Sequence, residues 1–209
     1  MAVTLRRIVR YLYDRYWRGP RGYGKPQPAE SWDRTFASGS WDFLTSEAEK
    51  GRYGVIRDFA LGYKSPLSLL DIGSGIGVLR STFVDGELSA YTGLDISIEA
   101  VKKCQGANYF CSEFIVGDFD TFAPDRTYDV IVFNESIYYS KDPPALLHRY
   151  WPHIAPGGMC IVSINDYDAR SRAQWRRLDR AFQADASRQV INEKGQLWDI
   201  KVYIKSQTG

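Results

Sequence analysis

The sequence predicts an α/β protein whose core is a doubly wound, mostly parallel β-sheet. Three observations support this prediction. Apolar runs typical of buried strands alternate with segments of helical periodicity between residues 67 and 164, a glycine-rich turn follows the first run, and two alternating runs lie near the end of the chain. Strands and helices that alternate in this way place helices on both faces of a parallel sheet. The last two runs, about Lys194-Gly195-Gln196, predict an antiparallel β-hairpin.

Length and composition limit the number of domains and the compartment. With 209 residues, of which 44% are hydrophobic, the chain can form one α/β domain with a full core but is too short for two ordinary ones. Its three cysteines have neither metal-like nor disulfide-framework spacing. No apolar run is long enough to span a membrane, and no segment resembles a signal peptide. We therefore expect a cytoplasmic protein with no metal and no stable membrane insertion.

The N-terminal part, residues 1–60, is predicted to be a helical cap or lid with a linker, in front of a main domain of residues 61–209. Up to Lys25 it carries seven basic residues against one acidic residue, although the whole chain has a net charge of only +2. Apolar residues of its first segment share one stripe of a helix: Leu5, Ile8, Val9, Leu12 and Tyr16. This helix either packs its stripe on the domain or contacts an anionic acceptor or a membrane surface.

A Gly- and Pro-rich loop, residues 19–28, separates this helix from an aromatic-rich segment. The large side chains of that segment are Trp32, Phe36, Trp41, Phe43, Tyr53, Ile56 and Phe59. Such density indicates either a packed core or a ligand, and the sequence does not choose between them.

The stretch of residues 67–79, LSLLDIGSGIGVL, is the centre of the functional prediction. Its apolar run suits a strand that is buried on both faces. Glycines follow at Gly73, Gly75 and Gly77, where they allow positive φ and let the backbone approach a ligand closely. A helix expected to begin near Ile76 would point unpaired N–H groups at the same place.

A dinucleotide-binding turn is the first alternative for this stretch. That fingerprint has the spacing G-x-G-x-x-G, whereas here the spacing is G-x-G-x-G and Val78 stands where the fingerprint has Gly or Ala. Asp71, two residues before Gly73, would repel a pyrophosphate and attract an ammonium group. The pattern D-x-G-x-G-x-G resembles motif I of the class I S-adenosylmethionine-dependent methyltransferases. This resemblance implies a seven-stranded Rossmann-like sheet with a C-terminal hairpin, and S-adenosylmethionine as the cofactor.

The chain after motif I continues the alternation of strands and helices. Strands are expected near residues 90–94, 110–116, 128–133 and 159–164, and helices near residues 98–105 and 144–154. Two helix starts carry cap signals, which are Ser97 and the run Asp142-Pro143-Pro144.

Two acidic residues end predicted strands, where ligands bind in open α/β sheets. Asp95 follows the last motif I glycine by about eighteen residues and can accept hydrogen bonds from the ribose of NAD or of S-adenosylmethionine. The resemblance assigns the adenine amino group to Asp118 and the adenine ring to Phe119. The alternatives are a helix cap for Asp95 and a solvated turn for Asp118.

The loop after the fourth predicted strand, in VIVFNESIYYSKDP, supplies candidates beside the transferred methyl group. The resemblance places Asn134 and Glu135 against the cofactor and Tyr138 and Tyr139 on the acceptor side, with core packing as the alternative for the tyrosines. The run is similar to that of small-molecule members, including the nodulation-type N-methyltransferases. Enzymes that methylate nucleic-acid amino groups usually have Asp or Asn, then Pro-Pro and an aromatic residue here, so no nucleic-acid partner is expected.

The family's other contacts carry over residue by residue. The predicted cofactor-binding residues are Asp71, Gly73, Ser74, Gly75, Gly77, Asp95, Ile96, Gly117, Asp118, Phe119, Asn134 and Tyr139. The resemblance also implies that the segment before motif I folds over the cofactor, with Trp41 and Tyr53 as its foremost aromatic residues.

Groups that could take a proton or anchor an acceptor lie near strand ends. The candidate catalytic residues are Glu135, Tyr138 and Asp166, and Tyr167 is a further candidate. His148 and His153 precede the amino end of the fifth strand and are predicted to be structural. Without a histidine, an amine acceptor is slightly favoured over a hydroxyl, which would need a general base.

The sequence therefore predicts a methyltransferase that acts on a small-molecule acceptor, such as a sugar or another natural-product intermediate. An NAD(P)-dependent oxidoreductase would share the sheet and Asp95 but would leave Asp71 and Asp118 unexplained. A non-catalytic nucleoside-binding module would retain these residues only by accident.

Overall fold

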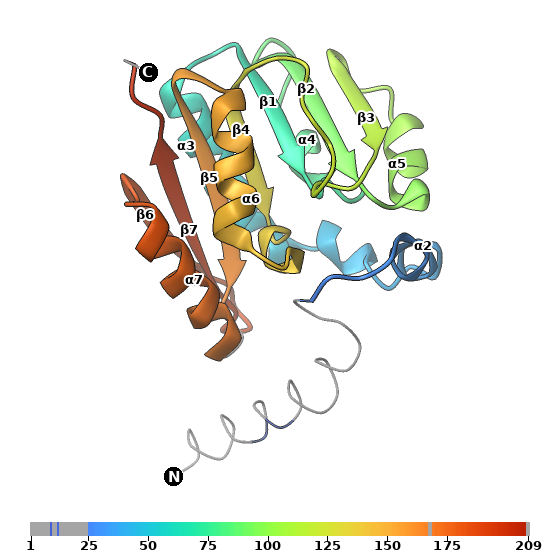
Figure 1. Cartoon of the computed structure of the whole chain (residues 1–209). Helices are drawn as coiled ribbons and strands as arrows, with labels where there is room; N and C mark the ends of the chain where they lie inside the picture. Colours follow the sequence, from blue (N-terminus) through green and yellow to red (C-terminus); the bar gives the residue numbers. More distant parts are fainter. Residues whose placement is uncertain (1–8, 10–11, 13–24, 167–168, 208–209) are drawn as a thin grey trace.

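A seven-stranded β-sheet organises the part of the chain that the computed structural model describes, which comprises residues 9, 12, 25–166 and 169–207 (Figure 1). The strand order is β3-β2-β1-β4-β5-β7-β6, and only β7 runs antiparallel to its neighbours. The strands are β1 Leu67–Ile72, β2 Leu88–Asp95, β3 Ser112–Val116, β4 Tyr128–Asn134, β5 Ile154–Asn165, β6 Ala186–Ile191 and β7 Leu197–Ile204. The prediction of a doubly wound, mostly parallel sheet with a C-terminal antiparallel hairpin is confirmed.

Helices cover both faces of this sheet (Figure 1). The α-helices are α2 Ala29–Ala37, α3 Glu47–Tyr63, α4 Val78–Ser81, α5 Ile98–Gln105, α6 Pro143–Tyr150 and α7 Ala169–Ala181, and the 3-10 helices are η3 Asp42–Thr45, η4 Ile137–Tyr139 and η5 Trp151–His153. Helices α3 and α4 pack on one face, and α6 and α7 pack on the other. The crossovers therefore wind in both directions from the centre of the sheet.

Strand β1 shows how the sequence builds two cores. Leu67 and Leu69 pack in the cluster under α3, whereas Leu70 and Ile72 pack in the cluster under α6. Successive side chains of a strand point to opposite faces, so a continuous apolar run is needed where both faces are covered. The reading of this run as a strand buried on both faces is confirmed.

The helix after the glycine-rich turn differs from the prediction. It begins at Val78 rather than near Ile76, and it is only four residues long. Gly75 and Gly77 have φ values of +54° and +74°, which no right-handed helix contains. Turn backbone, and not a helix end, therefore faces the ligand-binding edge at Ile76.

Helix α7 was missed by the sequence analysis, and β5 begins five residues before the expected strand. Only one narrow stripe of α7 is buried, including Trp175 and Leu178, and the rest of the helix is rich in arginine. Such a narrow apolar stripe gives a weak periodic signal.

The predicted caps are confirmed, because Ser97 accepts from the N–H of Ala100 at 3.2 Å and Asp142 from that of Ala145 at 3.4 Å.

Most of the predicted N-terminal amphipathic helix lies outside the described residues. Of its stripe, Val9 and Leu12 are described, and they are 58% and 45% exposed. The expected boundary at residue 60 falls inside α3, whose Tyr53 and Ile56 pack into the core of the sheet. No helix in the described ranges is both long and apolar enough to cross a membrane.

Candidate active site

A cavity of about 170 Å³ lies at the carboxyl ends of the parallel strands, and side chains of α2 and η3 contribute to its lining. The turns that follow β1, β3 and β4 and the end of β2 form its floor and walls, as is usual for ligand sites in open α/β sheets. Of the predicted cofactor residues, all but Gly77 line this cavity. The candidates Glu135 and Tyr138 line it as well.

The glycine-rich turn allows the backbone to form the cavity floor. Gly73 has φ +77°, and a Cβ added to it would lie 2.5 Å from the Cβ of Ser136. Glycine is therefore required at this position both for backbone conformation and for space. Gly77 packs instead against the Cys104 sulfur, 3.2 Å from a built Cβ, so it shapes the turn without reaching the cavity.

Two polar atoms beside this turn are buried without a hydrogen-bond partner in the described part of the chain. They are Oδ1 of Asp71 and Oγ of Ser74, and both residues line the cavity. The other Asp71 oxygen accepts the hydroxyl of Tyr91 at 2.6 Å. Burial raises the pKa of Asp71 to about 7. Buried polar groups are normally satisfied, so these atoms indicate a polar ligand.

Asp95 also holds the backbone around it, at the start of α5 as the helix-cap alternative suggested and at Gly75, which the sequence did not suggest. Its carboxylate accepts the backbone N–H of Gly75 at 2.7 Å and that of Ser97 at 2.9 Å, so it fastens the glycine-rich turn to the start of α5. Burial raises its pKa to about 6, although both backbone hydrogen bonds act in the opposite direction. On the neighbouring strand end, Asp118 lines the cavity and accepts the N–H of Asp120 at 2.8 Å.

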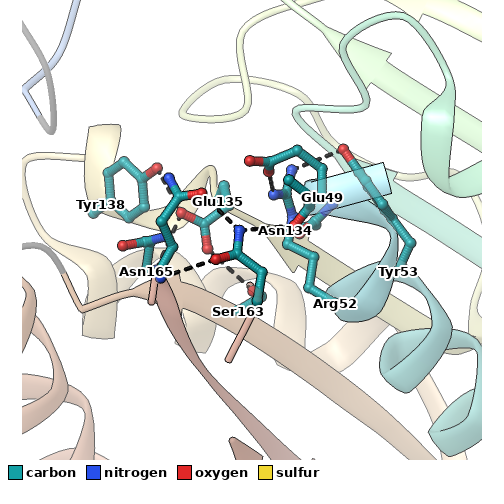
Figure 2. Close-up of polar contacts among 11 residues, drawn as sticks. Glu49, Arg52, Tyr53, Asn134, Glu135, Tyr138, Ser163 and Asn165 are labelled. Carbon is teal, nitrogen blue, oxygen red and sulfur yellow. Dashed lines mark hydrogen bonds and ion pairs between the residues drawn. The ribbon is translucent and has the colours of Figure 1, made fainter. Parts of the chain in front are cut away.

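The loop after β4 holds the carboxylate of Glu135 in a polar network (Figure 2). Glu135 accepts from the Tyr138 hydroxyl, the Ser163 hydroxyl and the backbone N–H of Asn165, each at 3.1 Å. Its φ is +58°, a conformation that is uncommon and costly for a residue with a side chain. Burial is the largest influence on its pKa and raises it.

A second network in Figure 2 centres on Arg52 of α3, which the sequence analysis missed. Its side chain is 3% exposed, and its guanidinium forms an ion pair with Glu49. It also donates to the Tyr53 hydroxyl at 2.8 Å and to Oδ1 of Asn134 at 3.2 Å. All four residues line the cavity. The available signal was the pair of opposite charges, three residues apart, on the face of α3 that also carries Ile56.

Helix α2 and the segment after it close the cavity with aromatic side chains. Trp32, Phe36 and Trp41 line it, and Trp41 is one of the two aromatic residues named for the predicted lid. Trp32 meets Tyr139 edge-on at 4.8 Å between ring centroids. Asp33 anchors α2, because it accepts from the Ser97 hydroxyl at 2.7 Å at the start of α5. Tyr53, the other aromatic residue expected in the lid, lies in α3, is buried beneath this layer and touches the cavity.

The remaining candidates lie elsewhere. Asp166 does not line the cavity; it pairs with Arg172 at 3.2 Å. Tyr167 is outside the described residues. His148 packs on Phe182 at 4.4 Å between ring centroids, and neither it nor His153 lines the cavity.

Comparisons with known proteins agree with this geometry. A family model described as a methyltransferase domain matches residues 47–200. A phosphoethanolamine N-methyltransferase of Triticum aestivum is 31% identical over 113 residues, which cover 49% of this chain but only 21% of that enzyme. The chain thus corresponds to about a fifth of the length of that curated relative.

Two solved structures have the same fold. The N-methyltransferase NodS from Bradyrhizobium japonicum, in complex with S-adenosylhomocysteine, superposes with a TM-score of 0.72 over 85% of this chain and 97% of that one, at 17% identity. A 1,6-didemethyltoxoflavin-N1-methyltransferase from Burkholderia thailandensis has a TM-score of 0.62 over 85% of this chain and 87% of that one, at 18% identity.

Proposed function

This chain belongs to the methyltransferase domain family, and from that premise we propose that it methylates a small-molecule amine with S-adenosylmethionine as the methyl donor. NodS is named an N-methyltransferase, and the wheat relative is named for the amine phosphoethanolamine. Both names support nitrogen as the acceptor atom.

The donor fits the residues around the glycine-rich turn. The unpartnered Oδ1 of Asp71 suits an ammonium group such as that of a methionine moiety, and Ser74 offers a second unpartnered polar atom. The guanidinium of Arg52, at the same end of α3 as Glu49, offers the only positive charge among the described lining residues for a carboxylate. Asp95 and Asp118 are available for the ribose and the adenine amino group.

The chemical step needs an oriented nucleophile and a proton acceptor. When bound, S-adenosylmethionine would supply a methyl group on a sulfonium sulfur, so that the amine lone pair forms the new nitrogen–carbon bond while the electron pair of the broken sulfur–carbon bond stays on sulfur. Holding the two reactants at attack distance can lower the barrier by several kcal/mol, up to about 7–11. The walls of the cavity supply this orientation.

The position of Glu135 is the main observation that supports an amine as the acceptor. Its carboxylate lies at the cavity, and burial raises its pKa toward the range in which a carboxylate takes a proton effectively. Tyr138 orients the carboxylate through its hydroxyl. No histidine lines the cavity among the described residues, and a carboxylate is a poorer base for an alcohol of high pKa than for an amine, whose methylated product carries an acidic proton.

Calorimetric titration of the purified chain with S-adenosylmethionine, S-adenosylhomocysteine and NAD tests the donor. We expect micromolar affinity for the first two and no heat with NAD. Binding of NAD alone would favour the oxidoreductase. Donor binding without methylation of any amine in a panel would favour a non-catalytic nucleoside-binding module.

A further inference from the structure

Five aromatic side chains form a continuous surface along one side of the cavity, and we call this set the aromatic wall. It comprises Tyr138, Tyr139, Trp32, Trp41 and Phe36, all of which line the cavity. Ring centroids are 4.7 Å apart for Tyr138 and Tyr139, 4.8 Å for Tyr139 and Trp32, 5.8 Å for Trp32 and Trp41, and 6.1 Å for Trp41 and Phe36. The wall joins the loop after β4 to the lid.

A carboxylate stands at one end of this wall. The hydroxyl of Tyr138 donates to Glu135 at 3.1 Å, so the first ring of the wall touches the acid directly (Figure 2). Aromatic faces attract cations through their quadrupole, and a carboxylate accepts the N–H of an ammonium group. Together they suit an alkylammonium group better than a neutral or anionic one.

The charges around the cavity also favour a cationic ligand. Six acids line it against one base among the described residues; the acids are Glu49, Asp71, Asp95, Asp118, Asp120 and Glu135, and the base is Arg52. Arg52 forms an ion pair with Glu49, donates to Tyr53 and Asn134, and is the group assigned above to the carboxylate of the donor. An additional phosphate would therefore face mainly carboxylates.

The start of α5, which could otherwise attract an anion, is also occupied. Asp33 accepts there from the Ser97 hydroxyl at 2.7 Å and from the backbone N–H of Glu99 at 3.3 Å. The chain's own carboxylate thus takes the place that a phosphate would take at a helix N-terminus.

We propose that the acceptor is a positively charged amine without a phosphate group, held with its cationic end between the aromatic wall and Glu135, which takes a proton from the nitrogen before the freed lone pair attacks the methyl group. The proposal rests on the methyltransferase function proposed above and narrows its substrate class. It differs from the phosphorylated amine for which the plant relatives are named, because the described lining has no free cation for a phosphate.

Binding to the complex with S-adenosylhomocysteine tests the proposal without turnover. The probes are choline, its uncharged isostere 3,3-dimethyl-1-butanol, and phosphocholine, and binding is followed by tryptophan fluorescence and calorimetry. A desolvated cation on aromatic faces is stabilised enough to give choline an advantage of about tenfold or more over the isostere. We expect phosphocholine to bind at least several fold more weakly than choline.

Two variants show where the discrimination arises. Trp32→Leu should reduce the preference for choline over the isostere by about fivefold, which corresponds to loss of one cation–aromatic contact. Trp151→Leu is the matched control, because Trp151 is similarly half-buried but packs on Phe182 and does not line the cavity. We expect that control to keep the preference of the native chain.

Equal binding of choline and the isostere, including no binding of either, would overturn the proposal, and so would tighter binding of phosphocholine. Either result leaves the methyltransferase function intact as long as S-adenosylhomocysteine binds in the first titration. If S-adenosylhomocysteine itself does not bind, the proposed function fails first.

Discussion

The two ends of the cavity are built in different ways. At the cofactor end, the glycine-rich turn of residues 73–77 meets Asp95 through backbone groups, and a Gly75–Asp95 hydrogen bond joins positions only 20 residues apart. Away from that turn, side chains from distant segments meet. Arg52 contacts Asn134, 82 residues along the chain, and Trp32 contacts Tyr139 where the acceptor is proposed to bind. Backbone geometry is set by a short motif, whereas side-chain networks can be changed one residue at a time. A common donor site can thus serve different acceptors.

The largest expected effect comes from a variant of Arg52, at the centre of its side-chain network. Arg52→Met leaves the Glu49 carboxylate buried without its cation, so the free energy of unfolding should fall by about 3–5 kcal/mol. Denaturant unfolding followed by circular dichroism measures this loss. Lys50→Met is the matched control, because Lys50 forms an exposed ion pair with Glu47 on the same helix, and its loss should cost less than about 1 kcal/mol. If the free energy of unfolding fell as little in Arg52→Met as in the control, the buried network would add no stability.

The next effect concerns proton transfer at Glu135. Glu135→Gln should lower kcat by about 100-fold or more, because the amine loses its proton acceptor. The acid limb of the pH–rate profile, which reports ionisation of this carboxyl, should disappear in the variant.

Tyr138→Phe gives the graded version of the same test. It removes one hydrogen bond to the ionised form of Glu135, so the pKa of that carboxyl should rise further and the acid limb should move to higher pH. An unchanged profile in both variants would remove Glu135 from the reaction.

At the cofactor end, Gly73→Ala tests whether backbone geometry is the essential feature. The variant strains a left-handed residue, at a cost of about 1–3 kcal/mol, and drives a methyl group into Ser136. Calorimetry should show no binding of S-adenosylhomocysteine. Gly86→Ala is the control, because Gly86 has φ +90° with no atom within 4 Å of the added Cβ. That variant should lose stability but keep its affinity, and full affinity in Gly73→Ala would contradict the prediction.

The smallest effect is a proton released at Asp71. With its pKa raised to about 7, Asp71 is about half protonated at pH 7, and a bound ammonium group should ionise it fully, releasing roughly half a proton. Titrations with S-adenosylhomocysteine in buffers of different ionisation enthalpy measure this release, and Asp71→Asn should abolish it.

The raised pKa of Asp71 also predicts that the free protein loses stability as pH rises from about 4 to 7, because the folded chain holds this proton while the unfolded chain does not. Asp71→Asn should make that slope shallower, and the part that remains comes from other buried acids with raised pKa, such as Asp95 with a pKa of about 6.

The comparison of the two ends also explains how far sequence reasoning could reach. The strand of residues 67–72, the glycines after it and the acids at positions 95 and 118 lie in short contiguous patterns. The strand forms as expected, and Asp71, Gly73, Gly75, Asp95 and Asp118 line the cavity, whereas Gly77 shapes the turn without reaching it. The network of Arg52 was missed because nothing near Arg52 in the sequence indicates that Asn134 will accept from it. Asp166 was misplaced for a similar reason. Its position at a strand end was correct, but its ion pair with Arg172 depends on α7, which the pattern had not revealed.

The sequence by itself determined the sheet, its winding and the donor side of the cavity, because apolar periodicity and glycine spacing act within a few residues. Tertiary structure decided which side chains close the cavity and which charged groups face it. Helix α2 reaches the loop after β4 through the contact of Trp32 with Tyr139, and Asp33 fills the start of α5. These contacts depend on how separate elements pack against one another, and packing is a property of the folded chain as a whole.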